Sequence, residues 1–273
     1  MKGKRIARGL GWIYCVFIAF FVLSPVAIIF PASFGASESL EFPPRAYSLR
    51  WYEQVLGDPQ WLASAALSAR IALFAALAAT AAGLLVGLSH FLVKRVAPGV
   101  RSFLMLPMVA PHIVLATGLF SVLLNARMLG DANVLALIHA SLALPLTMVI
   151  FINAVESIDP LLWTAASTLG ARWWTILRQI LLPILLTSVV VAFVLAFVVS
   201  WDEVTFAIFV GPSIVPTLPA RMFYYLRELI TPALAAVASL LVLVTIVVGL
   251  LILLVRWIGR PRRATAVPSK EAR

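Results

Sequence analysis

Six long apolar runs constrain this chain of 273 residues more than any other feature of its sequence. The hydrocarbon core of a bilayer is about 30 Å thick, so a helix of about 20 apolar residues is long enough to cross it. The runs cover residues 10–33, 71–93, 102–124, 132–152, 184 to between 200 and 210, and 232–255. They are too evenly apolar for barrel strands, which alternate in polarity. The sequence therefore predicts an all-α membrane protein with six transmembrane helices.

Composition excludes several other classes of protein. The chain is 63% hydrophobic and 12% charged, whereas a soluble domain is about 45–50% apolar and about 25% charged. This excludes a soluble enzyme, a disordered tail and a disulfide-framed module, and the lone Cys15 can form no intrachain disulfide. The net charge of +10 comes from short basic runs beside the apolar stretches. That distribution is typical of a membrane protein and not of one that binds nucleic acid.

The sequence also lacks the residues of a catalytic or nucleotide-binding site. It contains no Gly-x-x-x-x-Gly-Lys-Ser/Thr phosphate loop, so we expect this chain to bind no ATP. His90, His112 and His139 are far apart without the spacing of metal ligands, so we expect no metal site. No nucleophile lies beside a base in the pattern of an intramembrane enzyme. We therefore expect a non-catalytic chain without a cofactor of its own.

Basic residues predict the orientation, because cytoplasmic loops of membrane proteins are rich in Lys and Arg. If the amino terminus is cytoplasmic, the inside segments hold Lys2, Lys4, Arg5, Arg8, Lys94, Arg95, Arg101, Arg172, Arg178, Arg256, Arg260, Arg262, Arg263, Lys270 and Arg273. The outside segments then hold only Arg45, Arg50, Arg127, Arg221 and Arg227. Both termini are therefore predicted to be cytoplasmic. The first apolar run exceeds the about 7–15 residues of a signal peptide, so we expect it to be a retained helix.

The loop at residues 153–183 is too apolar and too rich in helix formers to be an ordinary linker. Asp159 followed by Pro160 predicts the start of a helix, and Gly170 predicts its end, so that the helix covers residues 160–169. A second short helix follows. Its predicted apolar face consists of Trp173, Trp174, Leu177, Ile180 and Leu181. Its polar face consists of Arg172, Thr175, Arg178 and Gln179, and Pro183 marks the entry into the fifth apolar run.

Two short helices joined at a glycine form a compact cytoplasmic projection, which we call the knob (residues 159–183). Its small residues allow another backbone to approach closely, and these are Ala165, Ala166, Ser167 and Gly170. One interpretation is docking into a groove of a soluble partner. The other is an amphipathic hairpin that lies on the membrane surface. Composition and spacing leave both interpretations open.

The knob resembles the cytoplasmic signature of permease subunits of ATP-binding-cassette (ABC) importers. That signature is Glu-Ala-Ala, three residues, Gly, nine residues, then Ile-x-Leu-Pro. This sequence has Thr164-Ala165-Ala166, three residues, Gly170, nine residues, then Ile180-Leu181-Leu182-Pro183. The one departure is Thr164, which retains a hydroxyl where the family usually has a carboxylate. A charge-assisted contact of that carboxylate is therefore absent here.

The resemblance implies a type I ABC importer permease fold in a bacterial inner membrane, with the knob as the coupling helix loop between the fourth and fifth spans. It implies an ATPase dimer that binds ATP and Mg²⁺, a second and related but different permease chain, and an extracytoplasmic substrate-binding protein. The expected domains are a first helix and outer loop (1–61), a permease domain (62–255) and a basic cytoplasmic tail (256–273). The residues expected to couple to the ATPase are Asp159, Thr164, Ala165, Ala166, Ser167, Gly170, Ala171, Arg172, Ile180, Leu182 and Pro183.

Trp201-Asp202-Glu203 stands at the far end of the fifth apolar run. Two carboxylates near a span are costly and usually functional, and a cationic substrate is attracted to both charges and to an indole face. The first interpretation is therefore a substrate path through these three residues. The second is local: the acids cap the next helix or pair with Arg221 or Arg227. The residues do not decide between them.

Further motifs are similar to permeases of the spermidine/putrescine type. These are Ser200-Trp201-Asp202-Glu203-Val204, Phe209-Val210-Gly211-Pro212, Leu218-Pro219, Phe42-Pro43-Pro44-Arg45 and Ser48-Leu49-Arg50-Trp51-Tyr52. The resemblance implies a polyamine as the transported solute. An importer permease for another small organic solute and a secondary transporter are the alternatives. A secondary transporter is expected to carry charges inside several spans, and the third, fourth and sixth runs contain none.

Gly83 and Gly87 form a small-xxx-small pattern in the second apolar run. Such a pattern lets two helix backbones approach closely. Because glycine is common in membrane helices, we interpret the pair as packing within the chain.

Overall fold

The computed structural model describes residues 2–93, 97–228 and 231–258, and these residues fold into helices as predicted. The helices are α1 (Lys2–Ala32), α2 (Arg50–Gly57), α3 (Pro59–Val93), α4 (Pro98–Val109), α5 (His112–Asn125), α6 (Ala132–Glu156), α7 (Pro160–Thr168), α8 (Trp173–Ile176), the π-turn η1 (Leu177–Leu181), α9 (Leu182–Trp201), α10 (Thr205–Val210), α11 (Leu218–Glu228) and α12 (Pro232–Ile258). Lys94, Arg95 and the tail from residue 259 lie outside the described residues.

Within the described residues, five helical segments are long and apolar enough to cross a membrane. The number is six if α4 and α5 together count as one bent span. The prediction of a multi-spanning all-α protein is therefore confirmed. The form predicted for the third run is wrong, because residues 102–124 are not one straight helix.

The third run breaks between α4 and α5, whose axes differ by 98°. The break falls at Ala110, which is extended with φ −73° and ψ 140°, and at Pro111, which precedes α5. A residue before proline is pushed out of the helical region by the proline ring. Hydropathy continues across this point, so the sequence pattern did not reveal the break.

One other predicted boundary differs from the structure, and the structure settles one that the sequence left open. The helix of the second run begins at Pro59, well before residue 71, because its first turns carry polar residues outside the apolar run. The fifth span ends at Trp201, which lies within the predicted range of 200 to 210, and residues 205–210 form the separate helix α10. Glu203, which caps α10 (described below), separates the two helices.

The core of the bundle is formed by α3, α6 and α9, which pack against one another most extensively. Their contact is lined by small residues, namely Ala75, Ala76, Ala79, Ala140, Ala143 and Ala196. Gly83 packs directly against Thr147, and Gly87 against Phe151. This confirms the prediction that the glycine pair serves packing within the chain. The Thr147 hydroxyl also donates a hydrogen bond to the carbonyl of Ala79 across this contact, at 2.8 Å.

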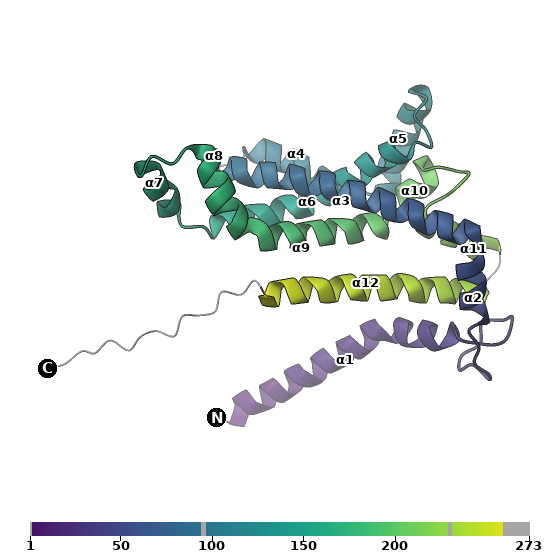
Figure 1. Cartoon of the computed structure of the whole chain (residues 1–273). Coiled ribbons are helices and arrows are strands. Elements are labelled where there is room, and N and C mark those ends of the chain that lie inside the picture. The colour runs from purple at the N-terminus through teal and green to yellow at the C-terminus, as the bar shows by residue number, and fades with distance from the viewer. Residues whose placement is uncertain (1, 94–96, 229–230, 259–273) are drawn as a thin grey trace.

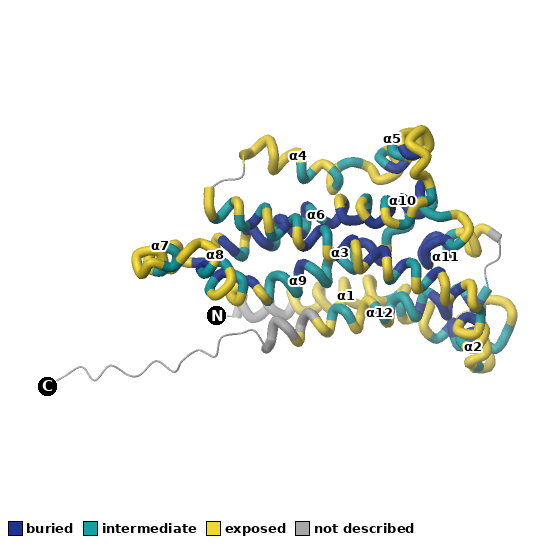
Figure 2. Tube along the Cα trace, turned by 45° about the horizontal axis from the view of Figure 1, so that its top comes forward, coloured by how far each residue is buried: buried dark blue, intermediate teal, exposed yellow. Residues whose placement is uncertain are grey.

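The long helices run side by side and separate two ends of the molecule (Figure 1). At one end lie α7, α8 and the start of α1, and at the other end lie α2, α5, α10 and α11. Buried residues concentrate along α3 and α6, whereas α1 and α7 are largely exposed (Figure 2). Among the described residues, α1 packs mainly against α12, and its apolar surface over residues 10–32 is largely exposed.

Candidate functional site

The knob begins and ends where local sequence signals predicted. The Asp159 carboxylate accepts a hydrogen bond from the Leu161 amide at 2.9 Å, which satisfies one of the unpaired donors at the start of α7. Pro160 occupies the first turn. The helix ends at Thr168, one residue before the predicted end, and Gly170 adopts φ +81°. Only glycine and a few polar residues adopt that conformation readily, so Gly170 reverses the chain between the two helices.

The tip of the knob presents small and polar residues to the surroundings. Thr164, Ala165, Ser167 and Gly170 are exposed, whereas Ala166 is half-buried against the base of the knob. The Thr164 hydroxyl lies 3.4 Å from the carbonyl of Pro160 in its own helix. Leu169 is 88% exposed beside Gly170. The exposed surface of α7 around Gly170 therefore combines small residues with the exposed side chain of Leu169.

The remaining signature residues connect the knob to α9. The Ala171 amide donates to the carbonyl of Ala166 at 3.0 Å, which closes the turn around Gly170. Arg172 is exposed, and its carbonyl accepts from the amides that begin α8. Ile180 and Leu182 are half-buried, and Pro183 is exposed.

The predicted apolar face of the second helix is wrong for two of its residues. Trp173 and Trp174 are 61% and 55% exposed, whereas Ile176, which was not predicted to be on that face, is 1% exposed. The cause is the π-turn η1, in which the Leu182 amide donates to the carbonyl of Leu177, five residues earlier. A π-turn inserts one extra residue per turn and so rotates the residues before it relative to those after it.

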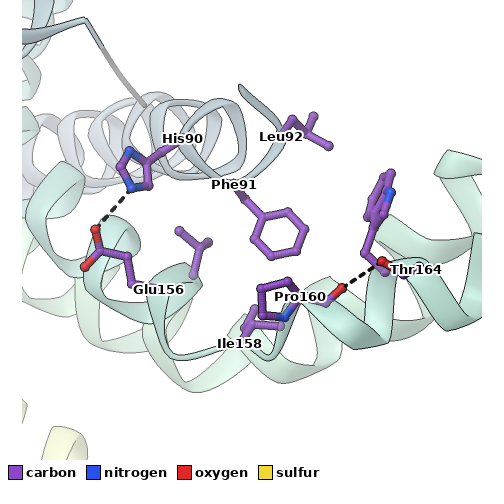
Figure 3. A pocket seen from close by; sticks show the side chains of 9 residues that line it. His90, Phe91, Leu92, Glu156, Ile158, Pro160 and Thr164 are labelled. Atoms are coloured by element: carbon purple, nitrogen blue, oxygen red, sulfur yellow. Dashed lines mark hydrogen bonds and ion pairs between the residues drawn. The ribbon is translucent and has the colours of Figure 1, made fainter. Parts of the chain in front are cut away.

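The base of the knob borders a cavity of about 630 Å³ (Figure 3). His90 and Phe91 from the end of α3, Glu156 from the end of α6, and Trp163 from α7 line it. A nitrogen of His90 lies 3.1 Å from a carboxylate oxygen of Glu156. The rings of Phe91 and Trp163 meet edge to face with 6.0 Å between centroids. The first contact thus joins the ends of α3 and α6, and the second joins the knob to α3.

The predicted acidic pair lies at the opposite end of the molecule, at the break between α9 and α10. One carboxylate oxygen of Glu203 accepts from the amides of Thr205 and Phe206, at 2.7 and 3.2 Å, and so caps α10. The other carboxylate oxygen lies 3.3 Å from a nitrogen of His112, at the start of α5. Glu203 therefore joins the end of the fifth span to the bend of the third.

Asp202 follows the last residue of α9 and is exposed. Partial burial raises the pKa of its carboxyl, and the neighbouring charge of Glu203 raises that pKa further. The carboxyl has no hydrogen-bonded or charged partner within the described residues. It is the acid of the pair that remains free to meet an external cation.

Trp201 does not share the surface of the two acids. Its side chain is buried and stacks on Phe197, with 5.7 Å between ring centroids, within a cluster that includes Trp51 and Trp61. The alternative of acids paired with Arg221 or Arg227 also receives no support. Arg221 donates to Ser64 and Gln60, and Arg227 lies over the ring of Phe223.

Sequence reasoning did not single out three buried or bridging polar contacts. His112 pairs with Glu203, buried His139 lies 2.8 Å from the Ser200 hydroxyl, and buried Arg221 donates to Ser64 at 2.8 Å. For His139, its position inside the apolar run 132–152 was a signal that a buried polar partner was needed. Within the described residues, no group of three metal-ligating side chains comes together.

A family model described as the binding-protein-dependent transport system inner membrane component matches residues 79–260, which is more than half of the chain. The chain belongs to this family. The matched region includes α6, the knob and α9, together with the acidic pair. Membership of an inner membrane transport family agrees with the multi-spanning apolar helices.

Curated relatives of this transport family cover most of the chain. The spermidine/putrescine transport system permease protein PotC of Haemophilus influenzae is 28% identical over 81% of this chain and 86% of its own length. PotC of Escherichia coli K12 is 28% identical over 89% of this chain and 91% of its own length. The putrescine transport system permease protein PotI of the same strain is 29% identical over 84% of each chain.

Solved structures share the fold. A chain of a bacterial ABC transporter involved in the import of the acidic polysaccharide alginate matches with a TM-score of 0.67 and 15% identity, covering 93% of this chain and 97% of that one. The same kind of transporter in complex with an alginate pentasaccharide-bound periplasmic protein matches with a TM-score of 0.65 and 14% identity, covering 94% and 95%. The chain therefore shares the fold of these ABC transporter chains.

Proposed function

We propose that this chain is the permease subunit of an ABC importer that takes up a polyamine of the spermidine/putrescine class. The observation that carries the proposal is the knob, a capped and glycine-terminated helix exposed at one end of a bundle that belongs to an importer family. Its partners are an ATPase dimer that binds ATP and Mg²⁺, a related but different permease, an extracytoplasmic binding protein and the lipid bilayer.

The knob serves as the coupling element in this proposal. An exposed tip of small residues suits a groove of the ATPase. The base of the knob packs against α3 through Phe91 and against the end of α6 through the buried cluster of Val155 and Ile176. Because the base of the knob is packed, a displacement of α7 by the ATPase also displaces the core helices. The ATPase hydrolyses ATP, and the spans rock between outward and inward access.

The orientation follows from the same element. The knob and the start of α1 lie at one end of the bundle, so a cytoplasmic knob implies a cytoplasmic amino terminus. An even number of spans returns the carboxyl terminus to the same side. The opposite end, with α2, α10 and α11, then faces the binding protein.

The substrate class rests on the named relatives and on the acids beside α10. A polyamine carries several ammonium groups, and the exposed carboxylate of Asp202 is available to one of them. Glu203 adds negative charge nearby while it holds α10 and His112. Trp201 is buried in the cluster with Trp51, so its indole face is not available to a cationic substrate.

Reconstitution of the whole transporter tests both parts of the proposal. Proteoliposomes that contain this chain, its partner permease and the ATPase take up radiolabelled spermidine or putrescine when the binding protein and ATP are supplied. Asp202→Asn with Glu203→Gln lowers amine-stimulated ATP hydrolysis while the complex still assembles. Uptake without ATP overturns the importer assignment. ATP-driven uptake of a neutral solute, with no response to amines, overturns the substrate class alone.

A further inference from the structure

The π-turn between the knob and α9 has an identifiable cause in the sequence. The segment from Trp173 to Trp201 is one continuous helical stretch that contains the π-turn at Leu177–Leu181. Pro183 follows the last residue of this turn by two positions, and it has no amide hydrogen to donate to the carbonyl of Gln179, four residues earlier. In a regular α-helix its ring also collides with that carbonyl. A wider turn before the proline removes the collision.

The π-turn decides which residues of α8 face the core. Leu185, Leu181 and Ile176 are all buried against the ends of α3 and α6. The step of four residues from Leu185 to Leu181 is that of an α-helix. The step of five residues from Leu181 to Ile176 is not, because five residues overshoot one α-helical turn by about 140°. The extra residue in the π-turn brings Ile176 back to the buried face.

A regular α-helix gives a different packed face. Four residues before Leu181 is Leu177, and three or four residues before Leu177 are Trp174 and Trp173. These residues are the apolar face that α-helical periodicity predicts, yet both indoles are exposed in the structure. Loss of the π-turn therefore rotates α8 by about 100° about its axis, which is the advance of one residue. The α7 helix is connected to α8 by the turn at Gly170, which the hydrogen bond from the Ala171 amide to the Ala166 carbonyl closes. A rotation of α8 therefore displaces α7.

We propose that Pro183 is a positioning residue for transport: it imposes the π-turn, and the π-turn sets the rotational position of the knob relative to span α9. This inference rests on the proposed coupling role of the knob. The ATPase then meets the small-residue tip of α7 only when Ile176, and not Leu177, occupies the core. In this role Pro183 contacts neither nucleotide nor solute. Its effect on transport comes from the orientation that it gives to α7.

Cysteine labelling measures this rotation directly. In the complete transporter in detergent, with Cys15→Ser as background, Ile176→Cys reacts with a bulky maleimide about tenfold more slowly than Trp173→Cys, because only position 176 is buried. Adding Pro183→Ala speeds labelling at Ile176→Cys and slows it at Leu177→Cys. Unchanged labelling at both positions overturns the proposal. This measurement needs no transport activity, so its failure is distinct from failure of the proposed function.

A compensating deletion separates positioning from a merely structural role. Pro183→Ala alone lowers both the amount of ATPase that co-purifies with the permease and the solute imported per ATP hydrolysed, while the permease itself still inserts into the membrane. Deleting Gln179 in the same variant removes the extra residue, so a regular α-helix again places Ile176 in the core. This double variant recovers the import-to-hydrolysis ratio. A double variant that imports no better than Pro183→Ala contradicts the proposal.

Discussion

Gly83 of α3 and Thr147 of α6 pack so closely that a Cβ atom at position 83 would lie 2.7 Å from the Thr147 Cβ and 2.9 Å from its backbone carbon. No rotamer change relieves a contact with backbone, so a larger residue must push the two helices apart. Gly83→Ala is therefore expected to lower the free energy of unfolding by about 1–3 kcal/mol, as overpacked cores do. Thermal unfolding in detergent measures the effect. Gly118→Ala is the control, since a Cβ there meets nothing within 4 Å.

The start of α7 depends on the side chain of Asp159. Asp159→Ala removes the acceptor of the Leu161 amide and is expected to destabilise the first turn by about 1 kcal/mol. Hydrogen exchange of the α7 amides then becomes several-fold faster, and the ATPase binds more weakly. Asp159→Asn retains an acceptor and should exchange nearly as the parent does. Equal exchange in Ala and Asn variants would show that the cap contributes nothing.

Gly170 is required by its backbone conformation and not by lack of space. It adopts φ +81°, and a Cβ there meets nothing within 4 Å. Gly170→Val is expected to abolish transport while the chain still inserts, because a β-branched residue at this φ strains the turn by about 1–3 kcal/mol. Gly170→Asn is the matched variant, since asparagine tolerates this region. Normal uptake by Gly170→Val would refute the docking role of the knob.

Ser200 supplies a hydrogen bond to the buried His139 at 2.8 Å. Ser200→Ala leaves a buried imidazole without that partner, and the expected cost is about 1–3 kcal/mol. Ser141→Ala in the same helix as His139 is the control, because the Ser141 hydroxyl is exposed and bonds only to its own helix. Denaturant unfolding of the two variants measures the difference. Similar stability for both would mean that His139 has another partner.

The raised pKa of Asp202 predicts how the stability gained by removing its charge depends on pH. Its pKa is raised in the folded chain, so folding disfavours the ionised form and the ionised carboxylate destabilises the fold at neutral pH. Asp202→Asn is therefore expected to unfold at a higher temperature than the parent at pH 7–8. The difference shrinks as the pH falls through the folded pKa and disappears below the ordinary pKa of about 3.9. A difference that grows on acidification would contradict the raised pKa.

Local signals accounted for the elements that sequence reasoning found correctly. The apolar runs, the Asp159-Pro160 start and the Gly170 stop each act within one helical turn or along one helix. The signature from Thr164 to Pro183 located the knob, because its spacing reflects a short helix, a turn and a helix entry. These properties follow from hydropathy and capping, which need no knowledge of distant residues.

The errors arose because an apolar pattern reveals neither a change in helical geometry nor the partner of a distant residue. Periodicity placed Trp173 and Trp174 on the packed face, but the π-turn before Pro183 rotated them outward. Hydropathy left the end of the fifth span open between residues 200 and 210. The structure places it at Trp201, where Glu203 caps α10 and pairs with His112, which is 91 positions away in the sequence. The same apolar pattern is compatible with a span that ends at Trp201 and with one that continues to residue 210.

The sequence by itself determined that this chain spans a membrane as helices and carries a glycine-terminated knob with an importer signature. The reason is that lipid leaves the backbone no other way to satisfy its hydrogen bonds, and that capping is local. Prolines mark the break at Ala110 and the π-turn before α9, but only the tertiary structure decided the 98° angle between α4 and α5 and the partner of Glu203. These depend on which surfaces of α3, α5 and α6 are available for packing, and packing joins residues that the chain keeps far apart.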